Sequence, residues 1–234
     1  MKIDNATVLV TGTNRGIGLA FAKAALARGA RKVYAGARNP DSVTLPGVTP
    51  LRLDVNSPAD IAAAARDASD VSLVINNAGI AQFMGLLAPA AEASLREQLE
   101  TNVFGVLRVA QAFAPVLAAQ GGGALLNVAS VASWITSPAL ASYAVTKAAA
   151  WSLSNGLRQA LRGQKTQVLT LHMGFVDTGM TEAIDRAKSS PEDIVARALD
   201  ALEAGAEEVL ADEVTQQVKR GLSAQPGVYL QAVE

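Results

Sequence analysis

Short runs of apolar residues alternate along the chain with stretches that carry apolar residues at helical spacing. The candidate strands are residues 6–10, 32–37, 48–55, 71–79, 124–130 and 166–174, with a shorter one at 207–211. Strands that are apolar throughout, rather than at every second position, are buried on both faces. Helices packed on both faces of a parallel sheet bury strands in this way. The sequence therefore predicts an α/β fold built on a doubly wound parallel sheet.

The stretches between the candidate strands predict helices, and several carry signals for a helix start or stop. Gly29 ends a helical pattern at residues 17–28. Ser57 and Ser190 each precede a proline and, three residues on, an aspartate, as residues that begin a helix do. Two longer helices are predicted at residues 92–120 and 143–162.

No linker, repeat or low-complexity tract divides the chain. We therefore expect a single domain over residues 1–234. Residues 223–234 are weakly patterned, and we expect them to form a loose tail.

The composition narrows the function classes. Half of the 234 residues are hydrophobic and 18% are charged, which is enough material for a large core. The formal net charge is −1 without a basic block, so we expect neither nucleic-acid binding nor binding to a membrane surface. The lack of cysteine excludes disulfides, thiolate metal sites and thiol catalysis, and we assign no metal ligands. The first residues, MKIDNATVLV, lack the apolar segment of a signal peptide, so we expect a cytoplasmic protein.

One stretch has the length of a membrane span. No charged side chain occurs from residue 109 to residue 146. Gln111, Pro115, the glycines at 121–123 and Asn127 divide it into segments too polar for lipid. We expect it to form the buried middle of a soluble fold.

A glycine-rich turn, TGTNRGIG at residues 11–18, joins the first predicted strand to the first helix. Glycines there allow close approach of the backbone to a pyrophosphate, and the helix N-terminus directs free N–H groups at the anion. The alternative is an ordinary tight turn between a strand and a helix. A second strand at the distance of a βαβ unit favours dinucleotide binding.

The basic residues near this turn indicate which dinucleotide is bound. A site for NAD usually has an acid about twenty residues beyond the glycines, which binds the adenosine ribose. No acid occurs from Leu19 to Pro40, whereas Arg15 and Arg38 could both reach a 2′-phosphate. Arginine is also common on loops, but this pattern favours NADP(H) over NAD(H).

Tyr143 and Lys147 stand four residues apart in a predicted helix and therefore share one helix face. A fixed ammonium beside a phenol favours the phenolate and lowers the tyrosine pKa toward neutral values. The pair could thus be a tuned acid and base. The alternative is a core tyrosine beside a lysine whose charged end reaches solvent. Ser130 and the sequence NNAG at residues 76–79 end neighbouring predicted strands at the edge where such sheets bind ligands, which favours the first interpretation.

These motifs resemble those of the short-chain dehydrogenase/reductase family, in its classical branch. The resemblance covers roughly residues 5–180. The matching segments, in order and spacing, are TGTNRGIG, LDV at residues 53–55, NNAG, Asn102 in TNVFG, Ser130, YAVTK at residues 143–147 and MGFVDT at residues 173–178. The family pattern implies a Rossmann-type fold, and its spacing selects Ser130 over the nearby Ser133.

The resemblance also implies a role for each matching residue. Tyr143 would donate a proton to a carbonyl oxygen that is being reduced, or accept it in reverse, and Lys147 would lower its pKa and hold the nicotinamide ribose. Ser130 would bind the substrate oxygen, and Asn102 would fix a water that relays protons from Lys147. The hydride comes from the cofactor. The residues implied to bind the cofactor are Gly12, Arg15, Ile17, Gly18, Arg38, Asp54, Val55, Asn77, Ala78, Gly79, Tyr143, Lys147, Gly174, Val176 and Thr178.

The sequence departs from the family pattern after the sixth strand. The family usually has Pro-Gly there, whereas Met173 precedes Gly174 in this chain. Without the proline ring the backbone is less restricted, so the rigidity of the nicotinamide loop is in doubt. His172 matches no catalytic residue of the family, and we interpret it as a packed or partly exposed side chain.

Substrate pockets in the family are formed by the loop after the sixth strand, here residues 179–190. Candidate pocket walls, which could equally be core or interface residues, are Phe83, Met84, Trp134, Ile135 and Leu140. Family members often form dimers or tetramers through their long helices, so we expect a homodimer or homotetramer.

The leading hypothesis is an NADP(H)-dependent carbonyl reductase or alcohol dehydrogenase. One alternative is a regulator that binds the cofactor without turnover. Loss of the tyrosine or the lysine would favour this alternative, and both residues are present. A related epimerase or dehydratase is another, but it would usually need a longer C-terminal domain. The sequence does not name the physiological substrate, the direction of the reaction or its stereochemistry.

Overall fold

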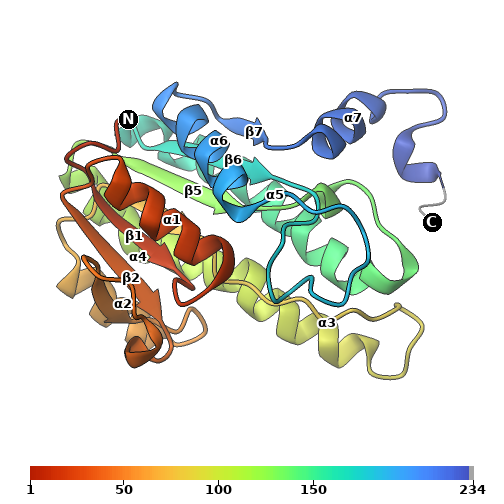
Figure 1. Cartoon of the computed structure of the whole chain (residues 1–234), viewed down its shortest axis with the longest axis horizontal. Helices are drawn as coiled ribbons and strands as arrows, with labels where there is room; N and C mark the ends of the chain where they lie inside the picture. Colours follow the sequence, from red (N-terminus) through yellow and green to blue (C-terminus); the bar gives the residue numbers. More distant parts are fainter. Residues whose placement is uncertain (232–234) are drawn as a thin grey trace.

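A computed structural model describes residues 1–231 and contains one parallel sheet of seven strands in the order β3-β2-β1-β4-β5-β6-β7 (Figure 1). The strands are β1 (Thr7–Thr11), β2 (Lys32–Ala37), β3 (Thr49–Arg52), β4 (Leu73–Asn76), β5 (Ala124–Val128), β6 (Gln167–His172) and β7 (Glu208–Leu210). The order reverses between β1 and β4, where the connections leave in opposite directions. The predicted doubly wound parallel sheet is confirmed.

Helices cover both faces of this sheet (Figure 1). The helices are α1 (Gly16–Ala27), α2 (Pro58–Asp67), α3 (Ala91–Leu99), α4 (Val106–Ala119), α5 (Ala141–Leu161), α6 (Pro191–Glu203) and α7 (Glu213–Gly221). On one face α1 and α6 pack against strand residues such as Val8 and Val10. On the other face α2, α4 and α5 pack against residues such as Leu9. Alternate residues of one strand thus serve two cores, which is why the central strands are apolar throughout.

The edge strand β3 differs from the expectation of wholly apolar strands. It is shorter than the predicted 48–55 and is largely exposed. An edge strand has a neighbour on one side only, so less of it is buried. Leu53 and Val55, which follow it, are buried instead.

The predicted helix at residues 92–120 forms, and it contains a π-helical segment. Residues Ala91–Ala119 form one continuous helix in which Glu100–Gly105 has π geometry, and this segment contains Asn102. Such single wide turns are frequent at functional sites. The sequence pattern did not predict this turn, because apolar spacing does not distinguish it from an α-helix.

The helix ends agree with the predicted signals. The Ser57 side chain accepts a hydrogen bond from the Asp60 backbone N–H, and Ser190 accepts one from Asp193. Gly29 adopts φ +80°, a left-handed conformation that suits glycine after a helix.

The C-terminal part contains a helix that the sequence analysis missed. Helix α7 starts at a capping box in which Asp212 and Thr215 bond to each other's backbone. Beyond it, a short 3₁₀ turn covers Val228–Leu230. Residues 232–234 of the expected tail lie outside the described residues.

Within residues 1–231, one helix is long and apolar enough to cross a membrane by length and composition, namely Ala91–Ala119. Its residues Val109, Phe113 and Leu117 are completely buried and belong to the core beneath the sheet. Packing against the sheet is sufficient to explain this apolar composition.

Candidate active site

The carboxyl ends of the strands meet at one edge of the sheet, and the glycine-rich turn lies there between β1 and α1. Asn77, which follows β4, connects this turn to the end of β4 through hydrogen bonds. Its side-chain amide donates hydrogen bonds to the backbone carbonyls of Thr11 at 2.9 Å and Gly12 at 3.2 Å. The Thr11 hydroxyl in turn accepts from the backbone N–H groups of Asn77 and Ala78, both at 3.0 Å.

Two glycines of the turn have no room for a side chain. A Cβ atom on Gly18 would lie 2.1 Å from the carbonyl oxygen of Gly12, so the helix could not approach the strand as closely. Gly12 has φ +70°, where a side chain is strained. The turn is therefore built by close backbone contact.

The first turn of α1 has no side-chain group that neutralises its positive end. Its N-cap residue, Arg15, makes no side-chain hydrogen bond to the helix, and the first turn contains no acid. By contrast, α2 and α6 have serine caps and acids in their first turns. Free N–H groups and the positive end of the helix dipole therefore face the edge of the sheet at α1.

Arg15 and Arg38 are both exposed near this turn. Arg38 directly follows β2, beside Gly36, whose carbonyl accepts from the N–H groups of Gly12 and Thr13. Within residues 1–231 neither arginine forms an ion pair closer than 4.0 Å. Two arginines without a carboxylate partner among the described residues thus lie near the uncapped N-terminus of α1.

The other residues implied to bind a cofactor follow strands at the same edge, after β3, β4 and β6, or lie in the first turn of α1. These residues are Ile17, Asp54, Val55, Ala78, Gly79, Gly174, Val176 and Thr178. The segment after β6 reaches the glycine-rich turn, since a Cβ atom on Gly16 would lie 3.4 Å from Thr178 Cγ2.

Ser130 lies two residues beyond β5, and Tyr143 lies in the first turn of α5. The Ser130 hydroxyl accepts a hydrogen bond from the Ala132 backbone at 3.1 Å and donates only weakly to the Met173 carbonyl, at 3.5 Å. Burial raises the pKa of Tyr143 above its ordinary value of 10, and a hydrogen bond with Ser130 acts in the opposite direction. The two side chains that the spacing selected are therefore brought together.

Lys147 is buried one turn further along α5. Its ammonium donates a 2.8 Å hydrogen bond to the Val128 carbonyl at the end of β5 and lies 5.6 Å from the centre of the Tyr143 ring. Burial lowers the pKa of Lys147 to about 8. Burial of the phenol acts on the Tyr143 pKa in the direction opposite to the lowering expected from this ammonium.

Asn102 in the π-helical segment makes three hydrogen bonds through its side chain. Its Nδ2 donates to the Ile80 carbonyl at 2.9 Å and to the Thr146 hydroxyl at 3.0 Å, and its Oδ1 accepts from the Ile80 N–H at 2.9 Å. Both amide hydrogens are used, so only an oxygen lone pair remains for a further partner. Asn102 thus joins the segment after β4 to α5.

His172 is completely buried and packed. Its Nδ1 lies 3.0 Å from the Ser130 carbonyl, which can only accept, so this nitrogen carries the proton. The ring stacks on Trp134 with centroids 4.1 Å apart. Of the two interpretations of this side chain, packed or partly exposed, the packed one is confirmed.

The family model described as short chain dehydrogenase matches residues 6–189. The chain belongs to this family. A gluconate 5-dehydrogenase of Gluconobacter oxydans is 33% identical over 199 residues, which cover 78% of this chain and 76% of that protein.

Solved structures of short-chain dehydrogenases have the same fold. One from Burkholderia cenocepacia, in complex with NADP, is 36% identical, with a TM-score of 0.92 over 97% of this chain and 96% of that one. One from Burkholderia phymatum, in complex with NAD, is 22% identical, with a TM-score of 0.87 over 100% of this chain and 99% of that one. The latter likeness concerns the fold alone.

Two of the candidate pocket walls, Phe83 and Trp134, have different surroundings. Phe83 is 45% exposed and lies in the loop between β4 and α3. Trp134 is half-buried and packs inside the chain, between His172 and the edge of Trp151. Trp134 and Trp151 therefore pack against each other within the chain.

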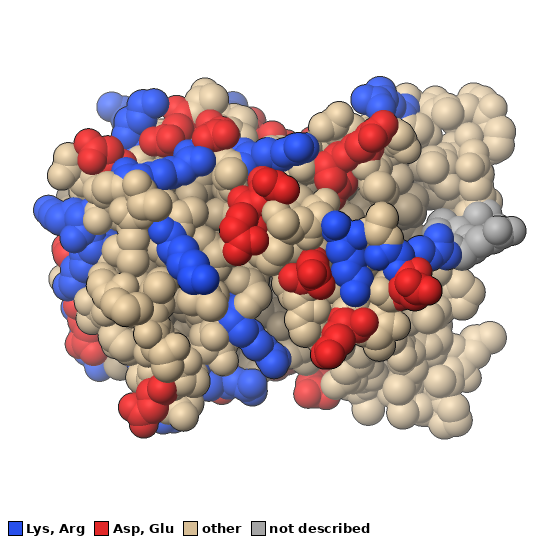
Figure 2. Space-filling view, viewed as in Figure 1, with Lys and Arg blue, Asp and Glu red and all other residues tan. Residues whose placement is uncertain are grey.

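Charge is unevenly distributed over the molecule. In Figure 2 basic and acidic side chains intermix on most of the visible face, and few occur where the loop between β4 and α3 lies. The sequence from residue 71 to residue 91 contains no charged side chain. The loop beside the candidate active site is thus apolar and uncharged.

Sequence reasoning missed two residues that support the site. Thr11 could have been suggested by its place at the start of the TGTNRGIG motif. Asp212 lies outside every motif and outside the range matched by the family model, but it bonds to Gly174 at 2.6 Å. The only signal for it is a helix-capping pattern, with a threonine three residues on.

Proposed function

We propose that the protein is an NADP(H)-dependent oxidoreductase that transfers hydride between nicotinamide and a carbonyl or secondary alcohol. The observation that carries this proposal is the meeting of Ser130, Tyr143 and Lys147 at the sheet edge that also holds the glycine-rich turn. A half-buried phenol beside a buried ammonium at this edge supports catalysis over nucleotide binding alone.

The residues at the turn fit a dinucleotide. The uncapped start of α1 and the missing Cβ atoms of Gly12 and Gly18 suit a pyrophosphate. Arg15 and Arg38 suit the additional phosphate of NADP(H), and the NADP complex of the Burkholderia cenocepacia relative supports that preference. The bound nicotinamide would supply the hydride.

Tyr143 would act as the general acid in reduction. Its raised pKa keeps the phenol protonated at neutral pH, which is the form that donates a proton to a carbonyl oxygen. The Ser130 hydroxyl donates only a long hydrogen bond to the Met173 carbonyl and lies within hydrogen-bonding reach of Tyr143, so both hydroxyls would bind one substrate oxygen on which negative charge develops.

Lys147 would hold positive charge beside the reacting groups. Its bond to the Val128 carbonyl fixes the ammonium under the ring of Tyr143. In alcohol oxidation, that charge would favour the phenolate as the tyrosine accepts a proton. Asn102 would support the arrangement through Thr146, the neighbour of Lys147, with a relay water on its remaining lone pair.

The substrate class we favour is an uncharged ketone, aldehyde or secondary alcohol. The apolar loop with Phe83 offers surface for an apolar substrate and no cation for a carboxylate. We further propose a cytoplasmic, single-domain protein that forms a homodimer or homotetramer through the long helix Ala91–Ala119 and α5, where Phe104 and Val145 are exposed.

The test is to follow NADPH absorbance with a panel of ketones, aldehydes and diketones, and NADP⁺ reduction with secondary alcohols. The proposal predicts turnover with at least one substrate pair, and lower efficiency with NADH. Binding of NADPH without turnover of any substrate would favour the non-catalytic regulator. Conversion of a substrate without net change in NADPH would favour an epimerase or dehydratase.

A further inference from the structure

Asp212 connects the start of α7 to the loop that follows β6. One carboxylate oxygen, Oδ2, accepts a 2.6 Å hydrogen bond from the backbone N–H of Gly174. The other oxygen accepts from the backbone N–H of Thr215 at 2.8 Å and from its hydroxyl at 2.6 Å. One side chain therefore caps a helix and holds a loop from a distant part of the sequence.

The Asp212 carboxylate depends on these donors. The residue is 9% exposed, and within residues 1–231 it forms no salt bridge. A buried carboxylate without a cation must be stabilised by N–H and O–H groups. Hydrogen bonds to ionised acceptors are shorter and stronger than neutral ones, and the length of the Gly174 bond agrees with this.

The loop that Asp212 holds forms one wall of the candidate cofactor crevice. At its start, the Met173 carbonyl accepts a 2.8 Å hydrogen bond from the Val131 N–H, next to Ser130. Four residues beyond Gly174, Thr178 lies against the glycine-rich turn at Gly16. The segment 174–178 thus runs from the candidate catalytic serine to the candidate phosphate site.

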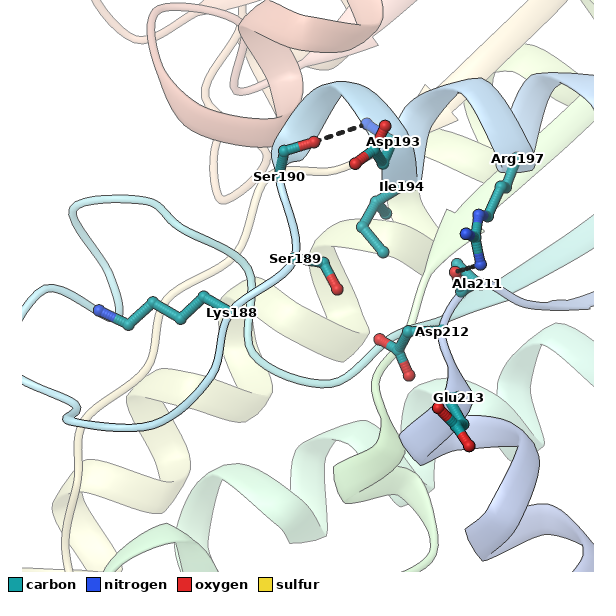
Figure 3. A pocket seen from close by; sticks show the side chains of 9 residues that line it. All are labelled: Lys188, Ser189, Ser190, Asp193, Ile194, Arg197, Ala211, Asp212 and Glu213. Carbon is teal, nitrogen blue, oxygen red and sulfur yellow. Dashed lines mark hydrogen bonds between the residues drawn. The ribbon is translucent and has the colours of Figure 1, made fainter.

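Other contacts hold the segment on both sides of Gly174: Met173 and Val176 are buried, and the Ser189 N–H donates a 2.9 Å hydrogen bond to the Phe175 carbonyl. Met173 replaces a residue that would restrict the backbone, so a proline ring does not fix this position. Asp212 and Ser189 also line a cavity of about 310 Å³ between the segment 188–190, α6 and the start of α7, as Figure 3 shows. The Asp212 carboxylate is the group that holds the Gly174 N–H at the edge of this cavity.

We propose that Asp212 is a positioning residue for the nicotinamide half of the cofactor. Its carboxylate orients the Gly174 N–H and thereby fixes the segment 174–178 in the shape that receives nicotinamide. This inference rests on the proposed function. It adds to the candidate site a residue from the C-terminal part of the chain. This residue lies outside residues 6–189, which the family model matches.

The test compares two ligands in Asp212→Asn. In that variant, an amide that still caps α7 with its oxygen would turn its NH₂ group toward the Gly174 N–H, where two donors oppose each other. The ligands are NADPH and adenosine 2′,5′-bisphosphate, which has the adenosine half of NADPH and lacks nicotinamide. We expect NADPH affinity to fall about tenfold and affinity for the bisphosphate to stay within about twofold.

Thr215→Val is the matched control. It removes the hydroxyl from the same helix cap but leaves the Asp212 carboxylate and its bond to Gly174. We expect it to lower the melting temperature like Asp212→Asn while both affinities stay within about twofold of the parent values. If Asp212→Asn does not fold, Asp212→Glu, which keeps the charge and shifts it by one methylene, is measured by the same criterion.

The outcomes separate this inference from the proposed function. Loss of NADPH affinity alone supports the positioning role. Equal loss of both ligands, or unchanged NADPH affinity, overturns it while the proposed function stands. If the parent protein itself binds NADPH no better than the bisphosphate, the segment 174–178 adds no affinity for the nicotinamide half and this inference fails, whereas turnover of NADPH decides the proposed function.

Discussion

The amide of Asn102 donates a 3.0 Å hydrogen bond to the hydroxyl of Thr146, which in turn donates a 2.8 Å bond to the carbonyl of Tyr143. This chain of bonds joins the π-helical segment to the first turns of α5. Thr146 directly precedes Lys147, so the same contact fixes the backbone that carries both ionisable groups. The position of the tyrosine and lysine thus depends on a residue more than forty positions earlier in the sequence.

Asn102→Ala should therefore impair activity as well as stability. The substitution leaves the Ile80 N–H and carbonyl and the Thr146 hydroxyl without their partner, at a cost of about 1–3 kcal/mol of unfolding free energy. We expect kcat/KM to fall at least about tenfold. Asn127→Ala is the control, because its buried amide bonds to Asn76 and to Ser154 further along α5. An equal fall in kcat/KM in both variants would contradict a specific role for Asn102.

Arg38→Asp should reverse the preference between the two cofactors. An aspartate at this place would repel a 2′-phosphate and could accept a hydrogen bond from a ribose hydroxyl. We expect kcat/KM for NADPH to fall about a hundredfold and that for NADH to change less than about threefold. Arg66→Asp, at an exposed position in the last turn of α2, is the control for the change in charge. Similar losses with NADPH and NADH would refute the assignment of Arg38 to the 2′-phosphate.

Tyr143 should ionise only above pH 10 in the cofactor-free protein, because burial raises its pKa. The unfolded chain then releases this proton first, so the unfolding free energy falls as the pH rises above 10. The measurement is tyrosinate absorbance near 295 nm during a pH titration of the parent minus that of Tyr143→Phe. We expect no difference signal below pH 10. A component with a midpoint below about pH 9 would mean that Lys147 outweighs burial.

His172 should remain neutral in the folded protein throughout the near-neutral pH range. Desolvation lowers its pKa below the ordinary 6.5, although Ser130 and Glu208 act in the opposite direction. Because the unfolded chain binds this proton at higher pH than the folded one, the unfolding free energy falls as the pH drops below 6.5. Each tenfold loss of proton affinity on folding corresponds to about 1.4 kcal/mol of unfolding free energy.

His172 is the single histidine of the chain, so its ring can be followed without assignment in a proton NMR titration. We expect its ring resonances to stay at the same position between about pH 8 and pH 5.5. A midpoint near 6.5 would show that the ring is solvated and would remove its fixed bond to Ser130.

The sheet and the position of the site followed from the sequence because each has a local signal. Continuous apolar runs mark strands buried on both faces, and Gly29, Ser57 and Ser190 mark helix ends through their own conformations and side chains. The residues that end the strands must meet at one edge, because parallel strands place their carboxyl ends together. The spacing typical of the family then favoured Ser130 over Ser133.

Other features depend on tertiary contacts that no local pattern contains. The exposure of β3 follows from its place at the edge of the sheet, and burial of Tyr143, not its distance from Lys147, sets the direction in which its pKa moves. The bond from Asp212 to Gly174 joins residues 38 positions apart. Helix α7 was missed since it is short and only Thr215 and Val218 in it are buried.

The central claim is that Tyr143 supplies the proton in hydride transfer, and Tyr143→Phe tests it most directly. The variant removes one oxygen and keeps the ring, so NADPH affinity should stay within about threefold of the parent value. General acid catalysis contributes about 10²–10⁴-fold, and we expect kcat for carbonyl reduction to fall by that factor. Tyr34→Phe, at a buried tyrosine whose hydroxyl bonds to Asp70 away from the site, should keep its kcat. Retained turnover in Tyr143→Phe with unchanged NADPH affinity would contradict the account.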